Sequence, residues 1–194
     1  MLNKIKDDIY VFFKNQMAVK YPDVFGLDEN GFSNKIYWRK YRSEEPLKPY
    51  IILDVASQGK LNKTHETYKK YGKLYKRENW VMVITFSVYT QSTEGDLATE
   101  DRKAIEYIEY IQDLFNSQTT FDTLMKNAII VDEKEVSNIR DLSSFEETNY
   151  SYRYEIDVTF KFDIIKEPES YGLGERVEAN IEIKDSDLTI EIGA

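Results

Sequence analysis

Cysteine is absent from this chain of 194 residues, and histidine occurs once, as His65. Without cysteine the chain has no disulfide, no zinc–thiolate site and no thiol nucleophile, which fits a reducing compartment. A single histidine excludes a metal site made of several imidazoles. No apolar run approaches the roughly 20 residues of a membrane helix, and residues 1–8 lack the apolar core of a signal peptide. We therefore expect a protein made in the cytoplasm, with no membrane partner.

The common phosphate-binding and nucleophile motifs are missing as well. Neither GxGxxG nor GxxxxGK(S/T) occurs, so no glycine-rich loop is available to cradle a phosphate. The GxSxG motif of serine hydrolases is also absent, and His65 lies in a basic segment typical of an exposed loop. The sequence therefore predicts no catalytic residue and no cofactor.

Acidic side chains leave one enzymatic alternative, a metal-dependent nuclease built from carboxylates and a lysine. Residues 132–134 and 182–184 both read acid-x-Lys at a predicted strand end, and Asp54 could add a distant carboxylate. Such tripeptides arise by chance in a chain with 31% charged residues, and a nuclease needs a basic groove beside its acids. The neighbouring Glu146 and Glu147 are more typical of solvated loop residues than of a glycosidase pair. The nuclease stays an alternative to a structural role.

Negative charge is concentrated in the last third of the chain. The net charge is −9, yet residues 1–130 hold 19 Lys and Arg against 18 Asp and Glu. Residues 131–194 hold 7 against 17. A surface this acidic repels phosphate, so the balance argues against tight wrapping around nucleic acid. Solvated strand faces explain the same surplus without a functional role.

Apolar spacing predicts an α+β fold, with two main helices packed on a mixed, mostly antiparallel sheet. Intervals of three and four residues indicate helices, and short apolar runs indicate strands. Helices are expected at residues 2–20, 99–115 and 121–128, and strands at 50–55, 80–90 and 129–131. The length and the lack of internal repeats favour a single domain over residues 1–194.

The clearest pattern is an unbroken alternation of apolar and polar residues over residues 150–164, which predicts a strand with one dry and one wet face. The dry face comprises Tyr150, Tyr152, Tyr154, Ile156, Val158, Phe160, Phe162 and Ile164. The wet face comprises Ser151, Arg153, Glu155, Asp157, Thr159, Lys161 and Asp163. After a turn, residues 177–183 alternate again and are expected to return beside this strand as a long β-hairpin. A last alternating piece, residues 188–192, ends the chain.

The length of the strand at residues 150–164 points to self-assembly. Fourteen steps of about 3.3 Å span roughly 46 Å. A compact chain of this size has a diameter of about 40 Å. The strand must therefore bend strongly, or project beyond its own domain and be covered by another subunit.

A basic, aromatic segment occupies residues 60–77, with seven Lys and Arg against one Glu. It could form an arm that touches DNA or an acidic protein surface. It could also be an exposed hairpin or loop whose lysines keep an edge soluble. The candidate arm residues are Lys69, Lys70, Lys73, Lys76 and Arg77.

The element order and two sequence blocks resemble the neck or tail terminator proteins of tailed bacteriophages. The blocks are Ile-Arg-Asp-Leu at residues 139–142 and Tyr-Arg-Tyr-Glu-Ile-Asp-Val-Thr-Phe at residues 152–160, followed by the acidic alternation at 177–183. The resemblance covers residues 49–184, and the segments at 22–48 and 60–77 look like elaborations of that core. Its motifs are structural, and the family has no catalytic residues to carry over.

The resemblance implies a hexameric ring in the virion that closes the head-proximal end of the tail tube. Such a ring would contact itself, the tail tube and the head-completion proteins, and DNA would pass through without sequence-specific binding. Candidate interface residues are Tyr150, Tyr152, Arg153, Tyr154, Asp157 and Phe160, and candidate lumen-facing acids are Glu178 and Glu182. Arg153 and Asp157 could pair across a subunit boundary or form an ordinary cross-strand ion pair. Another phage morphogenesis subunit, such as a head-completion or tail-tube protein, is the runner-up.

Overall fold

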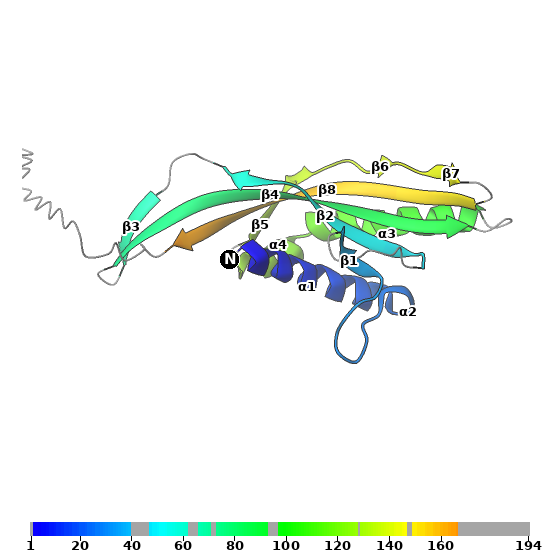
Figure 1. Cartoon of the computed structure of the whole chain (residues 1–194), viewed down its shortest axis with the longest axis horizontal. Helices are drawn as coiled ribbons and strands as arrows, with labels where there is room; N and C mark the ends of the chain where they lie inside the picture. The colour runs from blue at the N-terminus through cyan, green and yellow to red at the C-terminus, as the bar shows by residue number, and fades with distance from the viewer. Residues whose placement is uncertain are drawn as a thin grey trace, which may run out of the picture.

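The computed structural model describes residues 2–39, 47–61, 66–70, 73–92, 97–127, 129–146 and 149–166. Within these ranges, eight strands form one mixed sheet, and the helices lie on one of its faces (Figure 1). The α+β class and the mostly antiparallel sheet predicted from the sequence are therefore confirmed. We call the face turned away from the helices the outer face.

The central strands are the longest, and the strand order along the sheet is β1-β2-β4-β8-β5. Strand β3 pairs with β4, strands β6 and β7 pair with β8, and only the β1–β2 pair is parallel. The strands are β1 Ile36–Trp38, β2 Tyr50–Lys60, β3 Glu66–Lys70, β4 Lys73–Ser92, β5 Ile129–Val136, β6 Arg140–Asp141, β7 Ser144–Glu146 and β8 Asn149–Lys166.

Three of the described helices begin and end close to the predicted positions, and the short helix α2 was not predicted. They are α1 Leu2–Lys20, α2 Pro22–Phe25, α3 Leu97–Asn116 and α4 Gln118–Met125. Pro22 ends α1 as expected and also starts α2, because a proline in the first turn loses no helical hydrogen bond. Ser117 caps α4, since its hydroxyl accepts a hydrogen bond from the backbone N–H of Thr120 at 3.2 Å.

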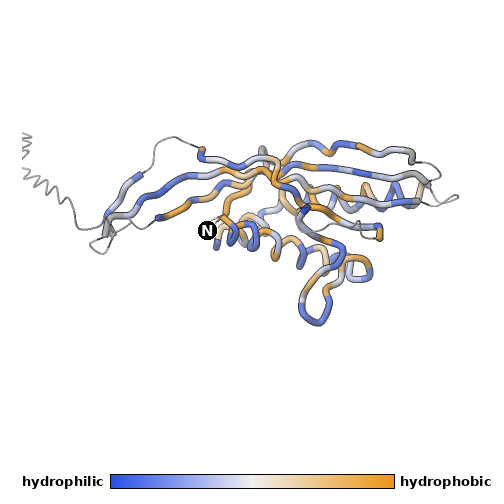
Figure 2. The backbone as a smooth tube through the Cα atoms, in the orientation of Figure 1, coloured by the Kyte–Doolittle hydropathy of each residue, from blue (hydrophilic) through white to orange (hydrophobic). Residues whose placement is uncertain are grey.

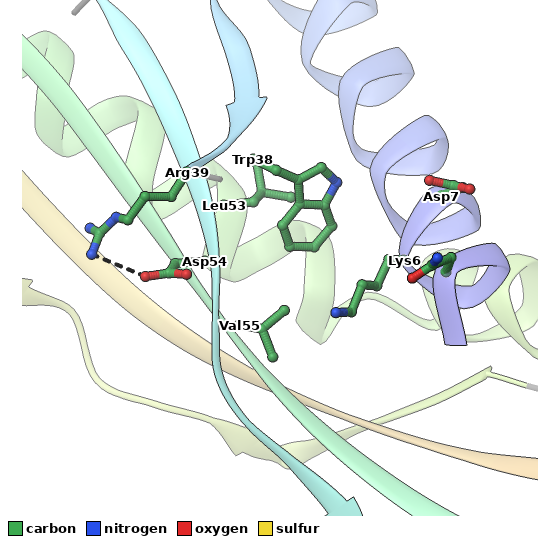
Figure 3. A pocket seen from close by; sticks show the side chains of 8 residues that line it. Lys6, Asp7, Trp38, Arg39, Leu53, Asp54 and Val55 are labelled. Carbon is green, nitrogen blue, oxygen red and sulfur yellow. Dashed lines mark ion pairs between the residues drawn. The ribbon is translucent and has the colours of Figure 1, made fainter. Parts of the chain in front are cut away.

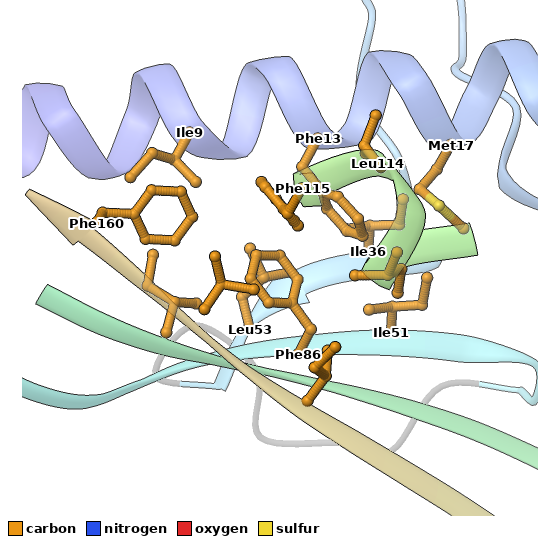
Figure 4. Packing of buried hydrophobic residues seen from close by; sticks show 14 of the residues in the cluster. Ile9, Phe13, Met17, Ile36, Ile51, Leu53, Phe86, Leu114, Phe115 and Phe160 are labelled. Atoms are coloured by element: carbon orange, nitrogen blue, oxygen red, sulfur yellow. The ribbon is translucent and has the colours of Figure 1, made fainter. Parts of the chain in front are cut away.

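The hydrophobic core lies between the helices and the inner face of the sheet (Figure 4). The ring of Phe115, on α3, packs against four other phenylalanines, two from α1 and one each from β4 and β8. These are Phe12, Phe13, Phe86 and Phe160, with ring centroids 6.4, 6.2, 5.0 and 5.6 Å away. Burying an aromatic side chain stabilises a fold by about 1.5–3 kcal/mol, so this cluster fixes both long helices to the sheet.

Strand β8 follows the predicted alternation, and β4 runs beside it in register from Lys76 opposite Lys166 to Ser92 opposite Tyr150. Strand β4 has 20 residues, many more than the predicted strand at 80–90, because its first part pairs with β3 and with the end of β8. Both long strands curve, and one end of the sheet projects beyond the helices (Figure 1). The sheet therefore bends and projects, while its dry face is covered mainly by helices of the same chain.

The expected hairpin partner of β8, residues 177–183, lies outside the described residues, as do residues 188–192. Over the described part of the chain, β8 pairs on one side with β4 and on the other with β5, β6 and β7. These partners leave only residues 163–166 of β8 with an open edge among the described strands.

The two segments predicted to be elaborations contain ordered elements. Residues 22–48 hold α2 and β1, and β1 adds a short parallel strand at the edge of the sheet. The basic segment 60–77 forms, over its described residues, the antiparallel pair β3–β4 at the projecting end. The tube at this end is largely hydrophilic along β3 and the start of β4 (Figure 2).

Candidate subunit interface

The outer face of the sheet carries a band of polar and charged side chains at its centre. Alternation places Thr85, Ser87 and Tyr89 of β4 on this face, opposite Asp157, Glu155 and Arg153 of β8. No helix covers this face in Figure 1. Among the described residues, the β6–β7 edge strands lie near it, and Lys48 Nζ donates a hydrogen bond of 2.8 Å to Ser151 on it. Thr85, Tyr89, Arg153 and Asp157 are partly exposed, so the band is a candidate surface for contact with another protein.

Asp157 is held by hydrogen bonds from two elements. Thr85 Oγ1 donates to Asp157 Oδ1 at 2.6 Å. Arg140, on β6, donates to both carboxylate oxygens of Asp157, at 2.6 and 3.0 Å. A bidentate guanidinium–carboxylate pair fixes geometry as well as charge, so this contact ties the β6 segment to the centre of the sheet.

Glu155 is the most buried acid of the band, with its side chain 9% exposed. Its Oε1 accepts a hydrogen bond of 2.7 Å from Ser87 Oγ and further bonds from Arg153. The guanidinium of Arg140 lies 3.5 Å from its other oxygen. A buried carboxylate needs such donors, because an unpaired charge away from water is costly.

These contacts shift both acids toward the charged form. Hydrogen bonding from Arg140 lowers the pKa of Asp157, against the opposing effect of burial. Burial raises the pKa of Glu155, but the bonds from Ser87 and Arg153 and the charges of Arg153 and Arg140 outweigh it, and the net pKa is lowered. Both carboxylates are thus ionised at neutral pH.

Aromatic rings extend the band toward the β1–β2 edge. The guanidinium of Arg153 lies over the ring of Tyr89, 5.3 Å from its centroid. Tyr89 stacks on Tyr50 of β2 at 4.7 Å. Arg39 and Asp54 form an ion pair of 3.0 Å at the same edge. Tyrosine and arginine are enriched at protein interfaces, so this composition favours a protein contact.

Three of the residues predicted to form an interface are instead buried inside the chain. Phe160 is fully buried against Phe115, and Tyr152 and Tyr154 are 6% and 7% exposed. The hydroxyl of Tyr154 donates a hydrogen bond of 2.6 Å to Asp101 on α3. The dry face is covered by the chain's own helices, so these side chains have no surface to offer a neighbour. The side chain of Tyr150 lies outside the described residues.

Arg153 and Asp157 do lie on the accessible wet face, but each has another partner within the chain. Arg153 bonds to Glu155, and Asp157 bonds to Arg140. Sequence reasoning missed Arg140, because its partner lies 17 residues away and pairs with it only when β6 docks beside β8.

A second charged cluster lies on the inner face of the projecting end, where three lysines surround Glu78. Its carboxylate is 2.9 Å from Lys60 Nζ, 3.4 Å from Lys76 Nζ and 3.2 Å from Lys166 Nζ. The indole N–H of Trp80 donates to it at 3.3 Å. The hydrogen bond from Lys60 is the main cause that lowers the pKa of Glu78, to about 2. Bonds from Lys166, Trp80 and Lys76 act in the same direction, and burial opposes them. The cluster holds three ammonium groups for one carboxylate and so carries a positive surplus.

The predicted basic arm is dispersed over both faces of this projecting end. Lys69 is exposed on β3, and Lys76 contacts Glu78. Arg77 points to the outer face, where its Nε donates to Asp163 Oδ2 at 2.8 Å and its Nη1 lies 3.7 Å from Glu66. Lys70 and Lys73 belong to β3 and β4, and their side chains lie outside the description. The arm is thus a charged antiparallel strand pair in which Lys76 and Arg77 already have acidic partners.

The remaining predicted site residues fall outside the described part. These are the candidate lumen acids Glu178 and Glu182 and the side chains of residues 132–134. Across the described residues, no group of three or more potential metal ligands lies together. None of the described helices is long and apolar enough to cross a membrane.

The sheet is curved, with helices on one face and a charged, hydrogen-bonded band on the other. The band has a composition found at protein interfaces, which is compatible with docking. The family model for the phage neck terminator protein matches residues 20–187, most of the chain. The chain belongs to this family, as the resemblance of its strand blocks predicted. No curated protein matches the chain.

Membership of this family makes the chain a structural protein of the phage neck, found in the virion and in contact with other virion proteins. The match begins at residue 20 and therefore includes the segments 22–48 and 60–77, which sequence reasoning had set apart from the core at 49–184.

Proposed function

We propose that the protein forms a hexameric ring at the head-proximal end of the phage tail. The ring caps the tail tube, joins it to the head-completion proteins, and lets DNA pass through its centre. The observation that carries this proposal is the family match over residues 20–187, and the outer face of the sheet, which no helix covers in Figure 1, supports it. The role is mechanical, and it calls for no catalytic residue and no cofactor.

The outer band supplies a surface suited to contact between virion proteins. Its acids and arginines are already positioned by Thr85, Ser87 and the neighbouring strand, so docking does not have to order them. Preorganised side chains lower the entropic cost of binding. We infer that Arg153 and Asp157 belong to this docking surface, while Tyr152, Tyr154 and Phe160 support it from the core.

We also propose that the chain acts as one domain in the ring, because its described strands join a single sheet around a single core. The acidic residues after the sheet, including Glu178 and Glu182, would then line or border the channel. A lumen lined with carboxylates repels the DNA backbone and lets it slide.

The test is complementation of a phage that lacks the gene for this protein. Without the protein, we expect heads and tails that fail to join and tail tubes of irregular length in electron micrographs. A plasmid copy should restore joined particles of uniform tail length. Normal virions in the absence of the protein would refute the proposed function.

A further inference from the structure

Among the described strands, the edge of the sheet beyond β1 is open, and it lies next to a groove. Strand β1 pairs only with residues 51–53 of β2. Among the described strands, none pairs with residues 54–60 of β2 on that side, and β3 pairs with β4 instead. We call residues 54–60 the open edge. Ala56, Ser57, Gln58 and Lys60 are exposed along it.

The backbone of the open edge can accept another strand. The N–H of Ile51 points to the β1 side, where it donates to Lys35 O at 2.7 Å. Because backbone N–H groups alternate along a strand, the N–H of Val55 points to the same side as that of Ile51. The bulge at residues 55–57 shifts the alternation by one residue, so the N–H groups of Gln58 and Lys60 also point to the β1 side. An exposed strand edge with such groups is a template for β-augmentation.

A groove beside this edge provides room for the apolar side chains of an added strand (Figure 3). It lies between β2 and the start of α1 and holds a volume of about 180 Å³. Its apolar lining is Trp38, Leu53 and Val55, and its rim carries Asn3, Lys6, Asp7, Arg39 and Asp54. We call this space the edge groove. A strand paired to the open edge would point every second side chain into it.

The chain itself contains a segment that matches this site. Residues 177–183 have the same length as the open edge, and they alternate apolar Val177, Ala179, Ile181 and Ile183 with polar residues. Among the described strands, only residues 163–166 of β8 keep an open edge, because the rest of β8 is paired on both sides. Four residues are too few to pair with all of residues 177–183, whereas the open edge offers seven.

We propose that residues 177–183 of one copy pair with the open edge of a second copy and place their apolar side chains in its edge groove. The inference rests on the proposed ring, for which it supplies the joint between neighbours. Strand β8 ends at Lys166, on the projecting end of the sheet. Val55 of the open edge lies at the level of Val158, which is eight residues before Lys166. The end of β8 and the open edge are therefore separated by about 26 Å along the strands. The donated segment thus leaves from one end of a copy and is received in the middle of the next. Such a head-to-tail contact closes into a ring when its rotation permits.

Disulfide crosslinking tests this pairing, because the chain has no cysteine of its own. Ser57 points to the outer face, opposite Val83, and is exposed. If the apolar residues of the segment enter the groove, Glu178, Asn180 and Glu182 share the outer face with Ser57. Each is replaced by cysteine in turn, in full-length protein carrying a size tag, and mixed with untagged Ser57→Cys protein. Cross-strand neighbours come close enough for a disulfide on oxidation.

We expect a mixed-size crosslinked dimer with at least one of these three positions. The matched control is Ile181→Cys, whose side chain faces the groove and should give no product with Ser57→Cys. Substituting Ile181 by lysine in the crosslinking chain should abolish the product, whereas Thr123→Ser on the exposed side of α4 should not. The same variants are assayed both in purified protein and in assembled phage particles.

Two outcomes overturn the inference. The first is the absence of a mixed-size product at all three positions in particles that contain the protein. In that case the proposed neck function stands and the strand exchange is wrong. The second is a crosslink that forms only within one chain when both cysteines are in the same copy, which would show that the segment fills its own groove. If the protein is missing from the neck altogether, the proposed function itself fails.

Discussion

The ion pair between Arg140 and Asp157 can be tested directly, because the sequence alone suggested Arg153 as the partner of Asp157. Arg140→Met removes the guanidinium but keeps most of the aliphatic stem, and Asp157→Asn removes the charge at constant size. The two groups make two hydrogen bonds, and their side chains are 42% and 28% exposed. Thr85 supplies a third bond to the same carboxylate.

The expected coupling energy follows from this geometry. Exposed ion pairs couple by about 0.2–1 kcal/mol. A bidentate, partly buried ion pair belongs at the upper end of this range. A double-mutant cycle on the free energy of unfolding should therefore give a coupling energy of about 1 kcal/mol. Urea unfolding followed by circular dichroism at neutral pH measures it, with the wild type, both single variants and the double variant. A coupling indistinguishable from zero would refute the assigned pairing.

A matched cycle between Arg153→Met and Asp157→Asn is the control, because the structure gives Arg153 a different partner in Glu155. Its coupling should be near zero and should not depend on protein concentration. Acid supplies a second check. The folded-state pKa of Asp157 is lowered, so its contribution is present above the ordinary aspartate pKa and is lost as pH falls through the folded value. The Arg140–Asp157 coupling should therefore disappear in strong acid.

Three further predictions address the core, a helix cap and the projecting end. Phe115→Ala should lower the free energy of unfolding by about 3–5 kcal/mol, because it leaves a cavity among four phenylalanine rings. Phe12→Ala, at a partly buried position, should cost clearly less in the same urea experiment, and equal losses would contradict the packing described. Ser117→Ala should cost about 1 kcal/mol by removing the α4 cap, measured by thermal unfolding, and an unchanged Tm would show that the cap contributes nothing. Glu78 should titrate near pH 2 in carbon-detected NMR, since its lysine partners stabilise the charged form. Its contribution to stability should be complete above the ordinary glutamate pKa and should be lost as pH falls toward 2. A normal pKa for Glu78 would exclude the three-lysine cluster.

Local periodicity predicted most elements of the fold. The apolar stripe of α1 and the alternation of β8 appear where the sequence places them, since both patterns reflect one dry face per element. The first part of β4 was not predicted, because residues 73–79 carry charges on both faces beyond the helices and so lack an apolar period. The unexpected element β1 has only three residues, too few to establish any period.

The candidate interface was harder to predict, because the sequence does not say which layer covers a dry face. The sequence pattern fits Phe160 and Tyr152 equally well as core residues or as interface residues. The packing of α1 and α3 against the sheet shows that they belong to the core. The bond between Arg140 and Asp157 depends on β6 docking beside β8, a contact between residues that local patterns do not link. The terminator resemblance, by contrast, could be read from the strand blocks, and the family match confirms it.

An electron cryomicroscopy reconstruction of the neck, from virions of the phage that encodes this protein, would show where the chain lies in the particle. We expect a closed ring of copies of this chain between the head-completion proteins and the tail tube, with DNA in its channel. A neck without this chain, or copies of it placed only in the capsid or at the distal tail tip, would refute the proposed ring.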